Sequence, residues 1–163
     1  MLQFQLSTVK FALKVLYPPY RKRLSNMKKV FKLIASGEAF ARFRPKLKLL
    51  LKQSNLNEKK ASEVLLGAQE VLTNILKHGY KGKPSEIRIT FKNEPDQISI
   101  TTQDFGERFD LTRCEKPKLP RTKPGGLGIF LIKASFDEVE YSAQREEGNL
   151  IRLTKIKKTE KIK

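Results

Sequence analysis

The chain has 163 residues, 39% of them hydrophobic and 31% charged, a composition that indicates one globular domain and excludes a disordered tail or a membrane bundle. Cys114 is the only cysteine and His78 the only histidine, which excludes an intrachain disulfide, a cysteine-built zinc site and a histidine-rich metal site. The net charge of +17 is a value typical of proteins that bind nucleic acid or anionic membranes.

The excess positive charge lies at the two ends. No acid precedes Glu38, whereas the bases before it are Lys10, Lys14, Arg21, Lys22, Arg23, Lys28, Lys29 and Lys32. After residue 151 the bases are Arg152, Lys155, Lys157, Lys158, Lys161 and Lys163, against Glu160 alone. A nucleic-acid surface would interleave bases with aromatic residues, so this distribution argues against direct nucleic-acid binding. We expect a basic extension over residues 1–27, one domain over residues 28–156 and a basic tail over residues 157–163.

The opening segment can form an amphipathic helix. Its apolar residues recur at helical spacing until Pro18 and Pro19 stop the helix. It is too short and too charged to cross a bilayer, and it lacks the cleavage site of a signal peptide. Two interpretations stay open: residues 1–26 form a helix that binds a membrane surface or a partner, or the natural chain begins at Met27.

The next elements are a strand and two helices. Residues 30–35 read as a buried strand, and Ser36 is an N-cap for the helix that follows, with Pro45 as an expected kink. Asn57 caps a second helix, which Gly79 and Gly82 end. Its apolar stripe consists of Ala61, Val64, Leu65, Ala68, Leu72, Ile75 and Leu76.

The second half of the chain contains mainly hairpins. Residues 86–92 and 97–103 alternate with period two across a turn at 93–96, and a long loop then runs to Pro124. A short helix over 129–136 precedes strands at 138–142 and 150–154, which are joined by a turn at 147–149. This order predicts an α+β, two-layer sandwich: a mixed, mostly antiparallel sheet with helices on one face.

Three segments carry candidate chemistry. Glu70 and Asn74 lie one turn apart on the polar face of the second helix; such a face is usually solvated, but an amide oxygen can bind Mg2+ and a carboxylate can accept a proton. Asp104 and Gly106 follow a strand, where the motif alone indicates only a turn. The glycines of segment 125–128 open a helix whose free N–H groups can bind an anion. This segment is neither a P-loop nor a Rossmann fingerprint.

Taken in order, these segments resemble the ATP-binding fold shared by gyrase, Hsp90, histidine kinases and MutL, and most closely the anti-sigma-factor serine kinases of bacteria. The N-box of that family is similar to residues 70–80, and its adenine-binding box is similar to residues 104–110. Its lid glycines match Gly126 and Gly128. The resemblance covers residues 28–156, and the joint order of three boxes is more specific than any one of them.

The resemblance implies a role for each matching residue. Asn74 would hold Mg2+ and Glu70 would be the general base, while Asp104 would receive the adenine amino group and Gly106 would make room for the ring. In the lid, the phosphates of ATP would meet Gly126, Leu127 and Gly128, with Lys123 or Arg121 as a charge partner. His78 would support the end of the N-box.

This sequence departs from the family at three points. Arg108 stands where many members of the wider superfamily have a second glycine, Asn149 stands where a threonine is common near the nucleotide, and the lid is short. These departures bear on nucleotide affinity and lid closure.

The predicted function is that of a cytoplasmic anti-sigma regulator that binds a sigma factor and phosphorylates a serine of an anti-anti-sigma protein of the STAS type, using ATP and Mg2+. A homodimer is expected from the resemblance. One alternative is a non-catalytic, ATP-binding partner-switching module, and another is a basic protein that binds nucleic acid or a membrane surface.

Overall fold

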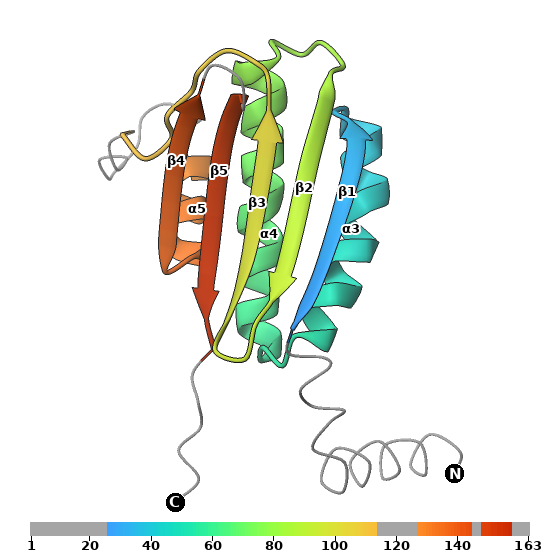
Figure 1. Ribbon diagram of the computed structural model, residues 1–163, viewed down its shortest axis with the longest axis vertical. Coiled ribbons are helices and arrows are strands. Elements are labelled where there is room, and N and C mark those ends of the chain that lie inside the picture. Colours follow the sequence, from blue (N-terminus) through green and yellow to red (C-terminus); the bar gives the residue numbers. More distant parts are fainter. Residues whose placement is uncertain (1–25, 114–126, 145–147, 158–163) are drawn as a thin grey trace, which may run out of the picture.

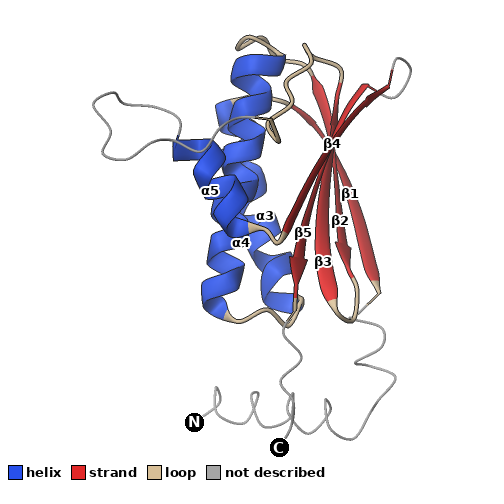
Figure 2. Cartoon of the chain, turned by 90° about the vertical axis from the view of Figure 1, so that its left-hand side faces the viewer, coloured by secondary structure: helices blue, strands red, loops and turns tan. Residues whose placement is uncertain are grey.

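The computed structural model describes residues 26–113, 127–144 and 148–157. These residues form two layers, a five-stranded sheet and a layer of helices on one of its faces (Figures 1 and 2). The strand order is β1-β2-β3-β5-β4, and each neighbouring pair is antiparallel. The predicted α+β sandwich is therefore confirmed, with no parallel pair within the described sheet.

The elements lie close to the predicted ranges, but the first strand was wrongly predicted as buried: it is an edge strand, and Val30 and Ile34 are half exposed or more. The strands are β1 (Met27–Ile34), β2 (Glu86–Asn93), β3 (Gln97–Asp104), β4 (Glu138–Gln144) and β5 (Gly148–Ile156). The helices are α3 (Gly37–Gln53), α4 (Glu58–Asn74), a π-helical turn η1 (Ile75–Gly79) and α5 (Leu127–Ser135).

Both predicted helix caps are present. The side chain of Ser36 accepts a hydrogen bond from the backbone N–H of Ala39 at 3.1 Å, and that of Asn57 accepts one from Lys60 at 2.8 Å. Each bond satisfies one of the N–H groups that a helix start leaves without a partner. Helix α3 continues through Pro45.

The core lies between the sheet and the helices. Alternate residues of the strands point inward, such as Ile87, Ile89 and Phe91 of β2, and they are fully buried. The predicted stripe of α4 supplies Val64, Leu65, Ala68 and Leu72 to the same core. Roughly 25 cal/mol per Å2 of buried apolar surface stabilises this arrangement.

The opposite face of α4 is covered by α5. Gly67 is buried, and a Cβ atom at this position would lie 2.6 Å from Cβ of Ser135 and 2.8 Å from the Phe136 ring. Glu70 and Asn74 on the same face are half-buried. The interpretation of this face as solvated is therefore wrong, because the helical period tells which residues share a face and not what packs on it.

The second helix changes its geometry at Asn74. Sequence analysis predicts one helix up to Gly79, but α4 ends at Asn74 and continues as η1. The backbone N–H of Tyr80 donates to the carbonyl of Ile75 at 2.9 Å, five residues back. Such π turns are frequent at functional sites.

The last strand begins earlier than predicted. Asn149 was expected in a turn, but it lies in β5 opposite Asp104 of β3 and Ala143 of β4. Two cross-strand partners hold its backbone in extended conformation, and its side chain is buried.

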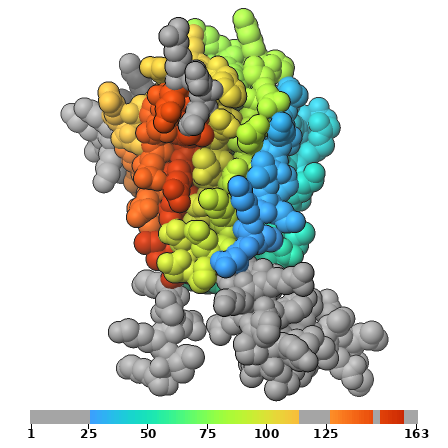
Figure 3. Space-filling model, viewed as in Figure 1, coloured from blue at the N-terminus to red at the C-terminus, as the bar shows by residue number. Residues whose placement is uncertain are grey.

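Among the described residues, no helix covers the other face of the sheet (Figure 2). In the space-filling view, side chains of the strands form the face toward the reader (Figure 3). It is mainly polar: Arg88 and Lys92 of β2 point outward, as do Ser99 and Thr101 of β3. Within the described residues, no helix has the length and apolar character needed to cross a membrane.

Candidate functional site

Glu70, Asn74 and Gly128 lie together where α4 meets the start of α5. A Cβ atom on Gly128 would lie 2.7 Å from Oε2 of Glu70 and 3.9 Å from Nδ2 of Asn74. Any other residue at position 128 would clash with the Glu70 carboxylate in its present position. The first turn of α5 therefore lies against the two polar side chains of α4.

The amide of Asn74 has an unsatisfied donor. Its Nδ2 is buried and makes no hydrogen bond within the part of the chain that the structure describes. A buried polar group without a partner costs about 1–3 kcal/mol. Such an amide is suited to a ligand that completes its contacts.

Asp104 lies at the end of β3 with only 2% of its surface exposed. Its Oδ1 accepts hydrogen bonds from the backbone N–H of Gly106 at 2.9 Å and from Nδ2 of Asn149 at 3.0 Å. Burial raises the pKa of the Asp104 carboxyl above its usual range, and the two hydrogen bonds oppose that rise. The carboxylate is thus held in one orientation with one oxygen fully used.

Gly106 allows two backbone segments to pack closely together. A Cβ atom at this position would lie 2.5 Å from the carbonyl carbon of Gly79, and the neighbouring N–H of Glu107 donates to the Gly79 carbonyl at 2.8 Å. The absence of a side chain at Gly106 therefore brings the segment after Asp104 against the end of η1. In this structure its space is filled by Gly79.

Sequence analysis missed the role of Tyr80. Its hydroxyl donates to the backbone carbonyl of Glu86 and accepts from the N–H of Phe105 at 3.3 Å. It thus joins the residue after η1 to the start of β2 and to the residue after Asp104. The sequence showed only that Tyr80 is the last residue of the N-box. Its two hydrogen-bond partners lie 6 and 25 residues away in sequence, so spacing could not reveal them.

The sequence placed Asn149 near the nucleotide but did not reveal its contacts with Asp104 and Tyr141. The hydroxyl of Tyr141 donates to Oδ1 of Asn149 at 3.0 Å, and Nδ2 of Asn149 donates to Asp104 and to the carbonyl of Gly106, the latter at 3.0 Å. The sequence marked Asn149 as a departure from the family pattern.

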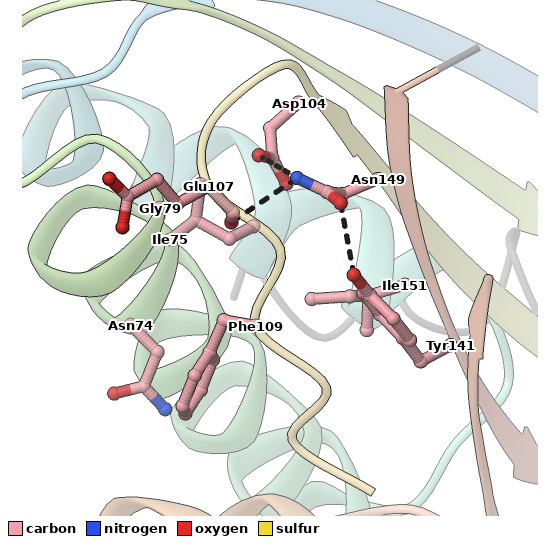
Figure 4. A pocket seen from close by; sticks show the side chains of 9 residues that line it. All are labelled: Asn74, Ile75, Gly79, Asp104, Glu107, Phe109, Tyr141, Asn149 and Ile151. Carbon is pink, nitrogen blue, oxygen red and sulfur yellow. Dashed lines mark hydrogen bonds between the residues drawn. The ribbon is translucent and has the colours of Figure 1, made fainter. Parts of the chain in front are cut away.

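These residues surround a small pocket (Figure 4). It is lined by Asn74, Ile75, Gly79, Asp104, Glu107, Phe109, Tyr141, Asn149 and Ile151. The ring of Phe109 stacks on His78 with 4.8 Å between the centroids, and Figure 4 shows it beside the amide of Asn74. The pocket volume is about 10 Å3, enough for one water molecule. An adenine ring can enter only if wall side chains such as Phe109 move.

Part of the predicted lid lies outside the described residues. This applies to Arg121, Lys123 and Gly126. Of the remaining lid residues, Leu127 is 55% exposed and Gly128 faces Glu70. The structure thus brings Glu70, Asn74 and Gly128 together on one side and Asp104 with Gly106 on the other.

Comparisons with known proteins identify the family of the chain. The sequence profile of the histidine kinase-like ATPase domain family matches residues 34–155. The chain is 30% identical over 139 residues to the serine-protein kinase RsbW of Staphylococcus aureus strain bovine RF122 / ET3-1, in an alignment that covers 79% of this chain and 86% of the relative. The RsbW of strain MRSA252 gives the same values. The chain belongs to the RsbW family of histidine kinase-like ATPase domains. Membership in this family indicates a kinase that uses ATP.

A solved structure shows the same fold. It contains the RsbU and RsbW domains of a Mycobacterium tuberculosis protein and superposes with a TM-score of 0.57 at 16% sequence identity. The match covers 80% of this chain but only 32% of that longer chain. It therefore supports the two-layer fold of the RsbW family and says nothing about the role of any residue.

The site fits Mg2+ that is bound together with a nucleotide. Within the described ranges no group of three or more His, Cys, Asp or Glu side chains could hold a metal ion. Mg2+ is commonly bound by one or two protein oxygens plus substrate phosphates and water. The amide of Asn74 lies beside Glu70, but the atom that lies toward Gly128 is the donor Nδ2, so the amide would have to turn its oxygen into the site to bind the ion.

Proposed function

We propose that this RsbW family member is an anti-sigma factor that binds a sigma factor and transfers the γ-phosphoryl group of ATP to a serine of a STAS-type anti-anti-sigma protein. The convergence of Glu70, Asn74 and the start of α5 at Gly128 carries the proposal. It supports a site in which a proton acceptor, a metal ligand and anion-binding N–H groups act on one phosphate.

The adenine would bind at the other side of the pocket. Oδ1 of Asp104 is used by Gly106 and Asn149, so Oδ2 is the oxygen that would accept a hydrogen bond from the exocyclic amino group. In the lid, Leu127 and Gly128 would contact the phosphates together with Gly126, and Lys123 would supply positive charge.

Glu70 would act as the general base. ATP, when bound, would supply the phosphoryl group, and Mg2+ would neutralise negative charge on the phosphates. The Glu70 carboxylate would accept the proton of the serine hydroxyl as the serine oxygen attacks the γ-phosphorus, the bond from that phosphorus to the bridging oxygen breaks, and ADP leaves. The Asn74 oxygen would hold the metal ion, and Gly128 keeps the space into which the Glu70 carboxylate extends.

The test compares two substitutions one helical turn apart. Glu70→Gln preserves size and polarity, so ATP binding should persist while transfer to a purified STAS protein slows by about a hundredfold to ten-thousandfold. Asn74→Ala removes a metal ligand and should weaken Mg2+-dependent ATP binding as well as transfer. Radiolabelled ATP measures transfer, and calorimetry measures binding.

The outcomes separate the kinase from the non-catalytic module. Absence of transfer to any STAS protein by the parent chain, together with intact binding of ATP and sigma factor, would leave the module as the function. Undiminished transfer by Glu70→Gln would assign the base to another residue.

Several finer features belong to the same proposal. The family resemblance leads us to expect a homodimer and a cytoplasmic location, and no direct contact with nucleic acid. Attachment to a membrane surface through residues 1–26 falls outside the described residues.

A further inference from the structure

The amide of Asn149 is surrounded by acceptors on its nitrogen side. Nδ2 donates to Oδ1 of Asp104 at 3.0 Å, to the carbonyl of Gly106 at 3.0 Å and to the carbonyl of Glu107 at 3.4 Å. An amide nitrogen has two hydrogens, and these three acceptors use both of them. Asn149 therefore has no donor left for a ligand.

The oxygen side of the same amide faces a donor. The hydroxyl of Tyr141 donates to Oδ1 of Asn149 at 3.0 Å (Figure 4). Rotating the amide by half a turn would place its oxygen against a carboxylate and two carbonyls and leave these acceptors without a donor. The surroundings thus permit a single orientation of the Asn149 side chain.

This orientation determines what Asp104 can offer. A carboxylate oxygen has two lone pairs, and Oδ1 uses them for Asn149 and for the N–H of Gly106 at 2.9 Å. Oδ2 of Asp104 remains available as an acceptor, because Asn149 donates to Oδ1 and places no donor beside Oδ2. A base with an exocyclic amino group can donate to Oδ2, whereas the carbonyl oxygen that guanine has at that position would meet a second acceptor.

We infer that Asn149 is a positioning residue that sets the preference of this site for ATP over GTP, by holding Asp104 in an acceptor-only arrangement. The inference rests on the proposed role of Asp104 at the adenine. It adds a residue of β5 that acts through Asp104 and whose orientation Tyr141 supports. Asn149 also fastens the turn that carries Gly106 and Glu107 to the sheet.

Two substitutions of Asn149 test the inference. Asn149→Asp keeps the shape but replaces the donors by acceptors, so two carboxylates face each other and share a proton. Asn149→Ala removes the donors without adding bulk, and it keeps the test usable if Asn149→Asp does not fold. In both variants we expect the ratio of ATP affinity to GTP affinity to fall about tenfold or more, because the donor that holds the Asp104 carboxylate in place is lost.

The measurement is calorimetric titration of the full chain with Mg-ATP and with Mg-GTP. The ratio matters, because general loosening of the fold weakens both nucleotides alike. Asn93→Leu is the matched control: Asn93 is another buried asparagine, on β2, and its Oδ1 accepts from Lys157 far from the pocket. This control should change the melting temperature and leave the ratio unchanged.

A further variant, Asp104→Asn, distinguishes failure of the role inferred for Asn149 from failure of the adenine site proposed at Asp104. If Asp104→Asn removes the preference for ATP and both Asn149 variants keep it, the inference about Asn149 is overturned and the adenine site stands. If the parent chain shows no preference for ATP, or Asp104→Asn has no effect on it, the adenine assignment fails and the role of Asn149 fails with it.

Discussion

Asp104 binds its proton more tightly in the folded chain than in the unfolded one, because burial raises its pKa above the ordinary 3.8. Between pH 3.8 and the raised value, the folded state holds more protons. The free energy of unfolding should therefore decrease as pH rises through this window. ATP affinity should change in the opposite direction, rising with pH as the acceptor becomes ionised. Thermal melts and ATP titrations across this range check both trends, and Asp104→Asn should remove the Asp104 contribution to the stability trend.

Gly128 offers a second prediction for a single residue. In Gly128→Ala the new Cβ would lie 2.7 Å from Oε2 of Glu70, and the carboxylate, at the end of a flexible side chain, would move away. A misplaced base should slow phosphoryl transfer about tenfold to a hundredfold, whereas stability should change by about 1 kcal/mol or less. Gly37→Ala is the control, because no atom lies within 4 Å of a Cβ added there. Equal transfer rates for both variants would remove Gly128 from the site.

At the scale of elements, the end of η1 and the turn after β3 hold each other. The backbone of Gly79 contacts Gly106 and bonds to Glu107, and the Tyr80 hydroxyl bonds to Phe105 and Glu86. The N-box and the adenine box are thus joined by direct contacts.

Tyr80→Phe tests this connection between the two boxes. The lost hydroxyl removes one hydrogen-bond partner from the Glu86 carbonyl and one from the Phe105 N–H, at about 0.5–1.5 kcal/mol of stability for each part-buried bond. We expect a higher KM for ATP with nearly unchanged kcat, because the turn beside Asp104 loosens while Glu70 and Asn74 stay in place. Steady-state transfer assays measure the two constants. A lower kcat at unchanged KM would show that Tyr80 acts on the chemistry instead.

At the scale of the whole molecule, we expect the basic ends to be separable from the sandwich. The described contacts reach from Met27, which pairs with Asn93, to Lys157, whose backbone N–H donates to Asp96 at 2.7 Å. A chain of residues 27–157 should keep its ATP affinity and lose any salt-sensitive attachment to anionic vesicles or DNA, because such attachment follows clustered Lys and Arg. Co-sedimentation at low and high salt, beside ATP titrations, gives the answer. Unfolding of the shortened chain would place the opening segment in the core.

Local signals in the sequence determined the elements, whereas the three boxes were recognised from their resemblance to a known family. Ser36 and Asn57 cap the expected helices because their side chains bond three residues ahead, within one turn. The inward residues of β2 follow from strict alternation. Glu70 and Asn74 are neighbours on any helix. Such features depend on few neighbouring residues, so they could be predicted from order and spacing alone.

Only the tertiary structure determined which of these elements and motifs contact one another. The spacing of α4 did not reveal that α5 covers Gly67, and the motif at Asp104 did not reveal that Gly106 packs on Gly79. Asn149 reaches Asp104 from 45 residues away because β5 pairs with β3. Sequence periodicity specifies the face of an element and its polarity, whereas the partner of that face depends on how the strands order in the sheet and how the helices pack on it.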